Sequence, residues 1–320
     1  MKDEGRRKSA CGPSEARSHR ARASGGGAPR ALIKDAVTGT ALWVLLLTIA
    51  AAAQQVAVRP ARIISLIPAV TEMLFAVGAG EQVVGVGSFD RYPPQVEKLP
   101  RVGALLDPDL EKMLSLRPDL VVIYGSQTDL QQQLERAKVP LFIYRHAGLA
   151  DVTKTMRELG GRVGRGQEAD AAAARVEAAL DAVGRSVKGR TKPRVLLVFD
   201  REAGALRGIY ASGGVGFLHD IIELAGGTNV FADVQRQSVQ AGTELILARR
   251  PDVILELRLG TLGEAAARAV RSDWDAIPAV PAVRNGRVVL IADERMRVPG
   301  PRVAEAARLI AETLHPDAFK

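Results

Sequence analysis

One phrase occurs twice in the sequence, and this repeat decides how the chain is divided. Residues 107–125 read DPDLEKMLSLRPDLVVIYG, and residues 240–257 read QAGTELILARRPDVILEL. In each copy a glutamate, Glu111 or Glu244, precedes a Pro-Asp pair by seven residues, and aliphatic residues follow. Because proline disfavours helical geometry in the residue before it, each copy predicts a short helix that leads into a buried strand. Two copies 133 residues apart predict two similar lobes, each with its own sheet.

The composition is that of a globular protein without a nucleic-acid partner. The 320 residues are 47% hydrophobic and 25% charged, which is ordinary for a folded protein and long enough for about two domains. The net charge of +8 is concentrated at the start: residues 1–53 hold nine Lys/Arg against four Asp/Glu, and the remainder holds 35 against 32. A remainder so nearly balanced carries no basic stripe, so we expect no nucleic-acid binding.

The N-terminus has the pattern of a secretory signal. A basic, polar stretch over residues 1–34 precedes an apolar run over 41–53 that ends in small residues. The 13 residues of that run are fewer than the about 20 that span a bilayer, and an uncleaved anchor stays open as the alternative. We expect cleavage near Ala53 and a soluble, exported, periplasmic protein. The single cysteine, Cys11, precedes that point, so the exported part has no thiol for a disulfide or a zinc site.

Predicted strands and helices alternate along the rest of the chain, at a spacing typical of parallel βαβ units. The predicted strands lie at 62–67, 83–86, 120–124, 140–144, 194–199, 253–257 and 287–291. Between the two sets, residues 167–188 form a long Ala-rich amphipathic stretch. We interpret it as a helix that bridges two lobes, while its periodicity leaves open one more crossover helix in a single sheet.

The predicted fold is therefore α/β, with two Rossmann-like lobes, parallel sheets, one long bridging helix and a ligand cleft between the lobes. The predicted divisions are a signal peptide over 1–53, an N-terminal lobe over 54–164, the bridging helix over 165–190 and a C-terminal lobe over 191–320. Ligands of open α/β sheets bind beyond the carboxyl ends of the strands, so the loops after the strands are expected to face the cleft.

Several stretches together resemble the periplasmic substrate-binding proteins of ABC importers for vitamin B12, haem and ferric siderophores. The resemblance covers about residues 59–318 and rests on the two repeat copies, the long Ala-rich helix and three further stretches. These are ISLIPAVTEMLFAVGAGEQVVGVGSFDRYPP (64–94), GFLHDIIELAGGTNVF (216–231) and AIPAVPAVRNGRVVLI (276–291). Each stretch alone is weak evidence for the family, but their order and spacing together are specific to it.

The resemblance implies a binding protein and not an enzyme. It implies a monomer without an intrinsic cofactor, which captures a small molecule and delivers it to a membrane permease and its cytoplasmic ATPase. The implied ligand is a corrinoid or an iron chelate, with cobalamin or a related corrinoid first and a ferric siderophore or haem as alternatives. It also assigns Glu111 and Glu244, one in each lobe, to docking on arginines of the permease.

Aromatic residues and one polar residue are predicted to contact the ligand. Phe89, Tyr124 and Phe199 align with aromatic positions that clasp a corrin ring in B12-binding relatives, and flat aromatic faces suit a conjugated macrocycle. Where the B12 binder has tryptophans before each glutamate, this chain has Leu105 and Ser238. Without these two tryptophans fewer aromatic side chains surround the ligand, which puts specificity for cobalamin in doubt. Ser238 is still expected to contact the ligand.

Arginines after the strands suggest an anionic ligand. Arg91, Arg201, Arg295 and Arg297 lie in loops expected to face the cleft, and arginine pairs bidentately with carboxylates and phosphates. Tyr92 and Tyr210 are candidates for contact with haem iron, although Tyr92 precedes two prolines. His146 and His219 do not form a metal pair, although His146 follows a strand and falls near the expected cleft rim. Trp274 matches a packing position.

Two other classes of function remain as alternatives. An enzyme on a doubly wound fold would need a signature such as Gly-x-Gly-x-x-Gly after a strand. In this chain Gly78-Ala79-Gly80 follows a helix, and Val83 stands where the third glycine should be. The other alternative is a membrane-tethered sensor or scaffold on the same fold, which an uncleaved apolar segment would mark.

Overall fold

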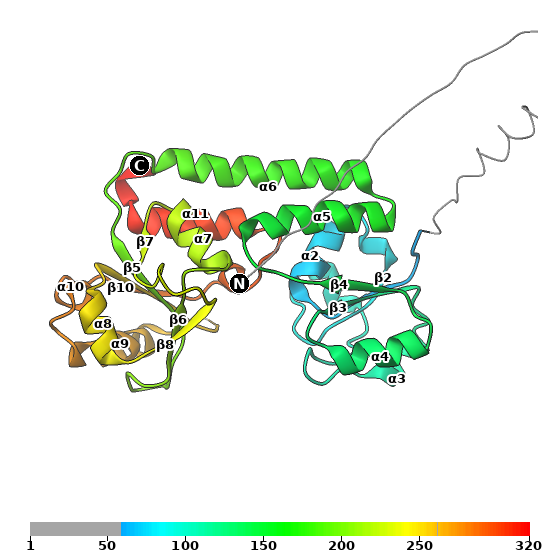
Figure 1. The fold of residues 1–320 in the computed structure, drawn as a ribbon, viewed down its shortest axis with the longest axis horizontal. Coiled ribbons are helices and arrows are strands. Elements are labelled where there is room, and N and C mark those ends of the chain that lie inside the picture. Colours follow the sequence, from blue (N-terminus) through cyan, green and yellow to red (C-terminus); the bar gives the residue numbers. More distant parts are fainter. Residues whose placement is uncertain (1–58, 261) are drawn as a thin grey trace, which may run out of the picture. The chain divides into compact units, whose positions relative to one another are not determined.

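The computed structural model describes residues 59–260 and 262–320, all within one compact unit of the chain. These residues form two α/β lobes, and the long helix α6 (Gly166–Ser186) runs alongside both (Figure 1). The predicted signal peptide and Cys11 lie outside the described residues. No helix in the described part is long and apolar enough to cross a membrane.

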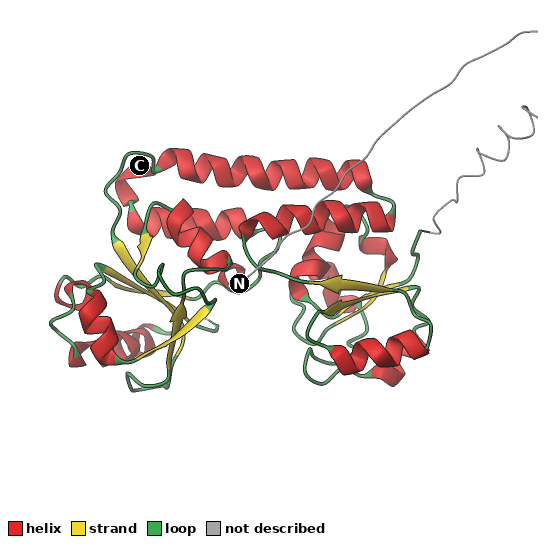
Figure 2. Ribbon diagram, in the orientation of Figure 1, coloured by secondary structure: helices red, strands yellow, loops and turns green. Residues whose placement is uncertain are grey.

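The N-terminal lobe is built on a four-stranded sheet in the order β2-β1-β3-β4, with every pairing parallel. Helices α2 and α5 lie on one face of the sheet, and α3 and α4 lie on the other (Figure 2). The elements are β1 (Ile63–Ser65), α2 (Pro68–Ala76), β2 (Val83–Val86), α3 (Leu110–Ser115), β3 (Leu120–Tyr124), α4 (Thr128–Arg136), β4 (Leu141–Tyr144) and α5 (Leu149–Val163).

The C-terminal lobe has a mixed sheet in the order β10-β9-β5-β6-β8, with β7 paired to β5. Strands β10, β9 and β5 are parallel, whereas β6 is antiparallel to both β5 and β8. The elements are β5 (Arg194–Asp200), β6 (Ile209–Ser212), α7 (Phe217–Leu224), β7 (Thr228–Asn229), β8 (Ser238–Ala241), α8 (Thr243–Arg249), β9 (Val253–Leu257), α9 (Glu264–Ser272), α10 (Pro281–Arg284), β10 (Val288–Ile291) and α11 (Val303–Leu314), with short 3₁₀ turns between several of them.

The expectation of two purely parallel sheets is thus wrong for the second lobe. Strand β6 and strand β8, which begins at Ser238, both lie between the predicted strands 194–199 and 253–257, where no strand is predicted. Both are only four residues long: β6 (IYAS) lacks the alternation of apolar and polar residues that identifies a half-buried strand, and β8 (SVQA) shows it only at the minimum length of about four residues. Strand β6 follows β5 after a connection of only eight residues, as an antiparallel partner can, so no crossover helix marks it in the sequence.

The repeated phrase fixes α3 against the first strand of the N-terminal lobe. The guanidinium of Arg62 donates to the Leu116 carbonyl at 2.8 and 2.9 Å, just after α3 ends. The Asp119 carboxylate accepts from the backbone nitrogen of Arg62 at 2.8 Å. The turn between them contains Arg117 at φ 48°. One arginine and one aspartate therefore clamp the end of the helix to the start of the sheet.

The second copy repeats this clamp in the C-terminal lobe. Arg194 donates to the Arg249 carbonyl at 2.6 and 3.2 Å, and the Asp252 carboxylate accepts from the Arg194 backbone nitrogen at 2.9 Å. Arg250 takes the same left-handed conformation, also at φ 48°. Helices α3 and α8 are consequently held in equivalent ways, and both cover the sheet face turned away from α6 (Figure 1).

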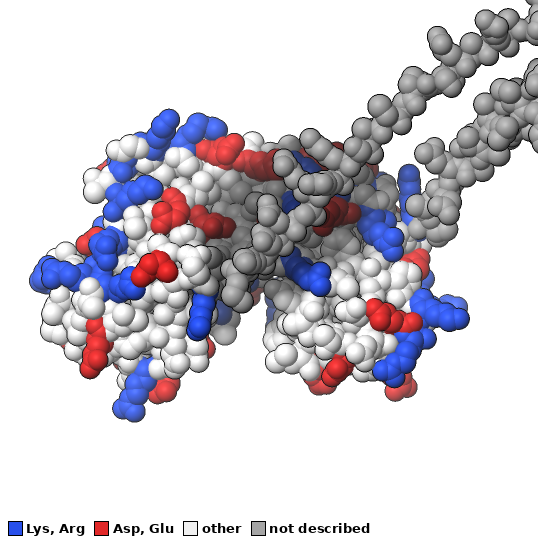
Figure 3. Space-filling model, viewed as in Figure 1, with Lys and Arg blue, Asp and Glu red and all other residues white. Residues whose placement is uncertain are grey.

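A continuous apolar core joins the two lobes. In β5, Val195 and Leu197 face the main core, while Leu196 and Val198 face a second core around Trp274, as the alternation of a strand requires. The main core extends from the N-terminal sheet through α5, α6 and α11 to β5 and β9. On the face drawn in Figure 3, positive and negative side chains are interspersed over both lobes, and the surface is hollowed between them.

Candidate functional site

A cavity of about 440 Å³ lies between the lobes, where the carboxyl ends of six strands meet. The N-terminal lobe contributes residues that follow β1, β3 and β4, and the C-terminal lobe contributes the ends of β5 and β9 and the loop after β10. Its size is within the range of about 300–1,000 Å³ that is usual for small-molecule sites. The cavity therefore lies where ligands of open α/β sheets bind.

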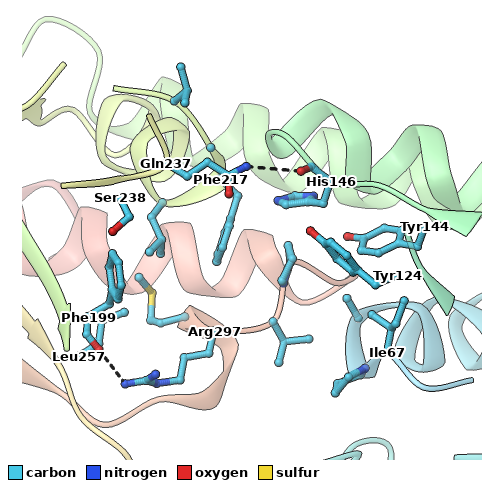
Figure 4. A pocket seen from close by; sticks show the side chains of 18 residues that line it. Ile67, Tyr124, Tyr144, His146, Phe199, Phe217, Gln237, Ser238, Leu257 and Arg297 are labelled. Atoms are coloured by element: carbon cyan, nitrogen blue, oxygen red, sulfur yellow. Dashed lines mark hydrogen bonds between the residues drawn. The ribbon is translucent and has the colours of Figure 1, made fainter. Parts of the chain in front are cut away.

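One wall of the cavity is an aromatic cluster from the N-terminal lobe (Figure 4). The rings of Tyr124 and Tyr144 meet edge to face at 5.6 Å, and the imidazole of His146 stacks on Tyr144 at 6.1 Å. Tyr124 and Tyr144 are neighbours on paired strands, β3 and β4, in the same register. The parallel sheet thus sets the spacing of the two phenols, and the chain turn after β4 adds the imidazole.

This cluster holds polar atoms that the protein leaves without partners. The hydroxyl of Tyr144 and both ring nitrogens of His146 are buried and have no hydrogen-bond partner among the described residues. Leaving such an atom unsatisfied costs roughly 1–3 kcal/mol, and each such case calls for an explanation. The atoms lie in residues that line the cavity, so a bound ligand is the partner that the site lacks.

Burial also sets the protonation of the cluster. Burial lowers the pKa of His146 from its usual value, and the carboxylates of Asp151 and Asp220 oppose this effect only in part. Burial raises the pKa of the Tyr144 phenol. At neutral pH the site therefore presents an uncharged imidazole, which is the form that binds metal ions, beside an uncharged phenol that can donate a hydrogen bond.

The opposite wall comes from the C-terminal lobe and is mainly apolar. Phe217, at the start of α7, packs edge to face on the His146 ring at 5.5 Å, so the two walls meet at this point. Leu257 and Met296 add further apolar surface to the lining. Gln237 donates to the His146 carbonyl at 3.5 Å (Figure 4), so both lobes hold the turn that carries the imidazole.

Three of the seven predicted ligand residues line this cavity: Tyr124, Phe199 and Ser238. The pairing of β5 with β6 is irregular between Val198 and Asp200, and an irregularity of this kind re-aims a side chain. Phe199 stands at that point and stacks on Tyr210 at 6.4 Å. Their contact with a ligand stays a prediction.

Arg201 corrects the expectation of an arginine free to meet an anionic ligand. Its side chain is 1% exposed and donates to Glu256 at 3.0 Å and Asp273 at 2.9 Å. Trp274 donates to the second Glu256 oxygen at 2.7 Å. The guanidinium is thus saturated within the C-terminal lobe, and Trp274 packs in the core as predicted. A sequence cannot reveal this network, because Glu256 and Asp273 lie 55 and 72 residues from Arg201.

The other predicted residues also lie outside the cavity lining. Arg295 is paired with Asp293 and Glu305, and these carboxylates already take up its charge. Arg91 and Phe89 lie on the exposed loop after β2, where the Phe89 side chain is 67% exposed. Arg297 is the arginine that does line the cavity, where it donates to the Phe199 carbonyl at 3.2 Å (Figure 4).

Two residues of the lining, Tyr144 and Phe217, were not among the predicted ligand residues, and His146 was expected only near the cleft rim. Tyr144 ends the predicted strand 140–144 and His146 follows it, so the rule of strand ends could have selected both as ligand contacts. Phe217 gave no such signal, because its helix reaches the cavity only through the fold of the second lobe. His219 is separate from the cluster and lies 3.3 Å from the Asn229 amide. Tyr92 packs on Arg302 instead of the cavity.

Comparison with known proteins fits this geometry. The model of the periplasmic binding protein family matches residues 63–294. The chain belongs to this family. An uncharacterised ABC transporter substrate-binding lipoprotein of Bacillus subtilis, YvrC, is 31% identical over 268 residues, with 82% of each chain covered.

Two further relatives have a named ligand. The vitamin B12-binding protein of Salmonella typhimurium is 29% identical over 255 residues, which cover 79% of this chain and 90% of the relative. The solved structure of the periplasmic haem-binding protein RhuT from Roseiflexus sp. RS-1, in its apo form, matches with a TM-score of 0.68 at 29% identity. That match covers 80% of this chain and 98% of RhuT. All three are named as binding proteins, and the match to RhuT shows that it shares the fold of this chain.

Proposed function

We propose that this protein is the substrate-binding component of an ABC importer and that it captures a metal tetrapyrrole, haem in the first place, in the periplasm. The observation that carries the proposal is the unpartnered Tyr144 hydroxyl and His146 imidazole in the wall of the interlobe cavity. A planar macrocycle would lie against the aromatic and apolar walls. Its metal would accept the neutral imidazole, and Tyr144 would donate a hydrogen bond.

The chemistry of haem suits the imidazole, the phenol and the apolar surface of this cavity. Haem iron takes histidine and tyrosine as axial ligands, and Phe199, Phe217 and Leu257 supply the apolar contact that a porphyrin face needs. Arg297 at the cavity edge could pair with a propionate. A ferric siderophore with several anionic groups is less well served, because Arg201 and Arg295 are already engaged.

A corrinoid is the second candidate, and the similarity to vitamin B12-binding proteins favours it. Its cobalt would take the same imidazole, and its ring would lie between Tyr124 and Phe199, two of the three aromatic residues that the sequence predicts for this contact. The test is titration of the purified protein with haemin, cyanocobalamin, cobinamide and a ferric hydroxamate, followed by absorption spectroscopy. We expect saturable binding of haemin at one equivalent with a shifted Soret band.

The variant His146→Ala should change the position of the Soret band and weaken binding, because it removes the axial imidazole. His219→Ala is the matched control, because that ring lies outside the cavity lining, and its spectrum should equal that of the parent. Saturable binding of cyanocobalamin alone would favour the corrinoid. Failure to bind any of the four chelates would overturn the proposal.

Delivery of the ligand requires a docking surface, for which we propose Glu111 and Glu244. Both side chains are exposed, one on α3 and one on α8. Neither forms an ion pair within residues 59–260 and 262–320, so both carboxylates are available to cations of a partner. We also retain the proposal that the protein acts as a monomer.

A further inference from the structure

Two exposed leucines occupy equivalent positions in the two lobes. Leu114 follows Glu111 by three residues on α3, and Leu247 follows Glu244 by three residues on α8. The two leucines are equally exposed, at 37%. Residues three apart on a helix lie on the same side. Each lobe therefore presents an isobutyl group directly beside a carboxylate.

The fold holds this arrangement in the same way twice. Met113 and Ile246, the residues just before the two leucines, are fully buried and anchor the helices to their lobes. The clamps made by Arg62 and Arg194 fix the helix ends to the sheets. The leucines consequently project from rigid elements, and their partial exposure does not result from a loose chain end.

A single exposed leucine would not indicate a binding surface, because isolated exposed apolar residues are ordinary on proteins. Here the exposed leucine, the neighbouring glutamate and the clamp all occur in both copies, while other surface positions of the repeat differ. At the position after the glutamate, for example, one copy has Lys112 and the other Leu245. Exposed apolar groups beside unpaired carboxylates match a partner surface that has a cation next to an apolar hollow.

We infer that Leu114 and Leu247 form the apolar half of the contact by which the protein docks on the importer's permease. The inference rests on the proposed function and deepens it, since the glutamates alone give steering and orientation more than affinity. Two equivalent patches fit a partner that offers two equivalent surfaces, as two copies of one membrane subunit do. Apolar contacts that exclude water would slow the dissociation of the protein from the permease.

The test uses the variant Leu114→Ser/Leu247→Ser and the cognate importer reconstituted in lipid nanodiscs. Binding is measured by surface plasmon resonance, with and without haemin, together with stimulation of the ATPase. We expect affinity for the importer to fall about tenfold or more, mainly through faster dissociation. Leu245→Ser is the matched control. It has the same 37% exposure on α8, but adjacent helix residues do not face the same side, so it should bind as the parent does.

The possible outcomes distinguish the leucine contact from the proposed docking role of the glutamates and from the proposed ligand. Loss of docking by Glu111→Gln/Glu244→Gln with normal docking by the leucine variant would overturn the apolar contact alone. Equal losses in the leucine variant and the Leu245→Ser control would overturn the assignment to these two positions. A change in unfolding free energy that accounts for the loss would also overturn it, since it would show a packing role. The haemin titration of the unaltered protein reports separately on the cargo.

Discussion

Asp90 shows how one buried residue can impose a pH dependence on the fold. Its side chain lies in the loop after β2, is fully buried, and has no hydrogen-bond partner for either oxygen among the described residues. Burial raises the pKa of its carboxyl from 3.8 to about 6, although the charge of the Arg101 guanidinium nearby opposes the shift. A folded-state pKa above the unfolded value means that the protonated form is favoured by folding.

The stability contribution of Asp90 should therefore be complete below pH 3.8 and should be lost as the pH rises past about 6. A difference of this size corresponds to about 3 kcal/mol. Asp90→Asn keeps the shape and removes the titration. In urea unfolding between pH 4 and 7.5, the variant should gain about 3 kcal/mol relative to the parent at the upper end. Parallel pH profiles for both proteins would contradict this.

Single residues also show where sequence reasoning stops. Tyr124 reaches the cavity because strand ends converge, which a sequence pattern can predict. Arg201 also follows a strand, β5, yet its guanidinium is held in the interior of the C-terminal lobe by the carboxylate of Glu256. Glu256 lies 55 residues further along the chain. Whether an arginine faces a ligand or a buried carboxylate depends on the partner that tertiary structure brings to it.

At the scale of elements, α3 and α8 carry the docking prediction. Charge reversal in Glu111→Lys/Glu244→Lys should abolish ligand-stimulated transport and ATPase stimulation, because like charges would oppose each other at the permease. Haemin affinity should be unchanged, since both helices lie outside the cavity lining. Both quantities can be measured on the reconstituted importer.

The matched control reverses two glutamates elsewhere, Glu81→Lys/Glu312→Lys, with one in each lobe. These side chains are solvent-accessible, and the Arg308–Glu312 pair that would be lost is a surface pair of little energetic value. Transport by the control should be normal. If both variants fail equally, overall charge governs docking and the two helices have no special role.

The elements themselves were predictable where local signals were strong. The predicted strands 83–86, 120–124 and 253–257 have the bounds that the structure gives to β2, β3 and β9. Helix α2 begins at Pro68, directly after the predicted strand 62–67, because proline is well suited to the first helical position. Strands β6 and β8 escaped prediction because their pairing is antiparallel and depends on partners that only the folded lobe provides.

At the scale of the whole molecule, one ion pair joins segments 230 residues apart. Arg302, at the start of α11, donates to the Glu72 carboxylate in α2 at 2.5 and 2.9 Å. It also lies 3.9 Å from the ring centroid of Tyr92. Together with the continuous core through α6, this contact ties the start of α11 to the N-terminal lobe.

Arg302→Leu should lower the free energy of unfolding by about 3–5 kcal/mol at neutral pH, because it leaves a buried carboxylate without its partner. The Glu72 side chain is only 4% exposed. Burial raises the pKa of Glu72, so the cost should shrink in acid as the carboxyl becomes neutral. Urea unfolding measures the change. Arg308→Leu, which removes an exposed pair on the same helix, should cost about 0.5 kcal/mol or less.

The same variant should loosen the two lobes, because Arg302 is bound to groups of the N-terminal lobe while its own helix packs in the C-terminal lobe. Spin labels at Ser115→Cys on α3 and Ser272→Cys on α9, in a Cys11→Ser background, would report the distance between lobes. A narrow distribution in the parent should broaden in Arg302→Leu and stay narrow in Arg308→Leu. If it stays narrow in both, the shared core alone sets the lobe geometry, and the ion pair contributes to stability without restraining motion.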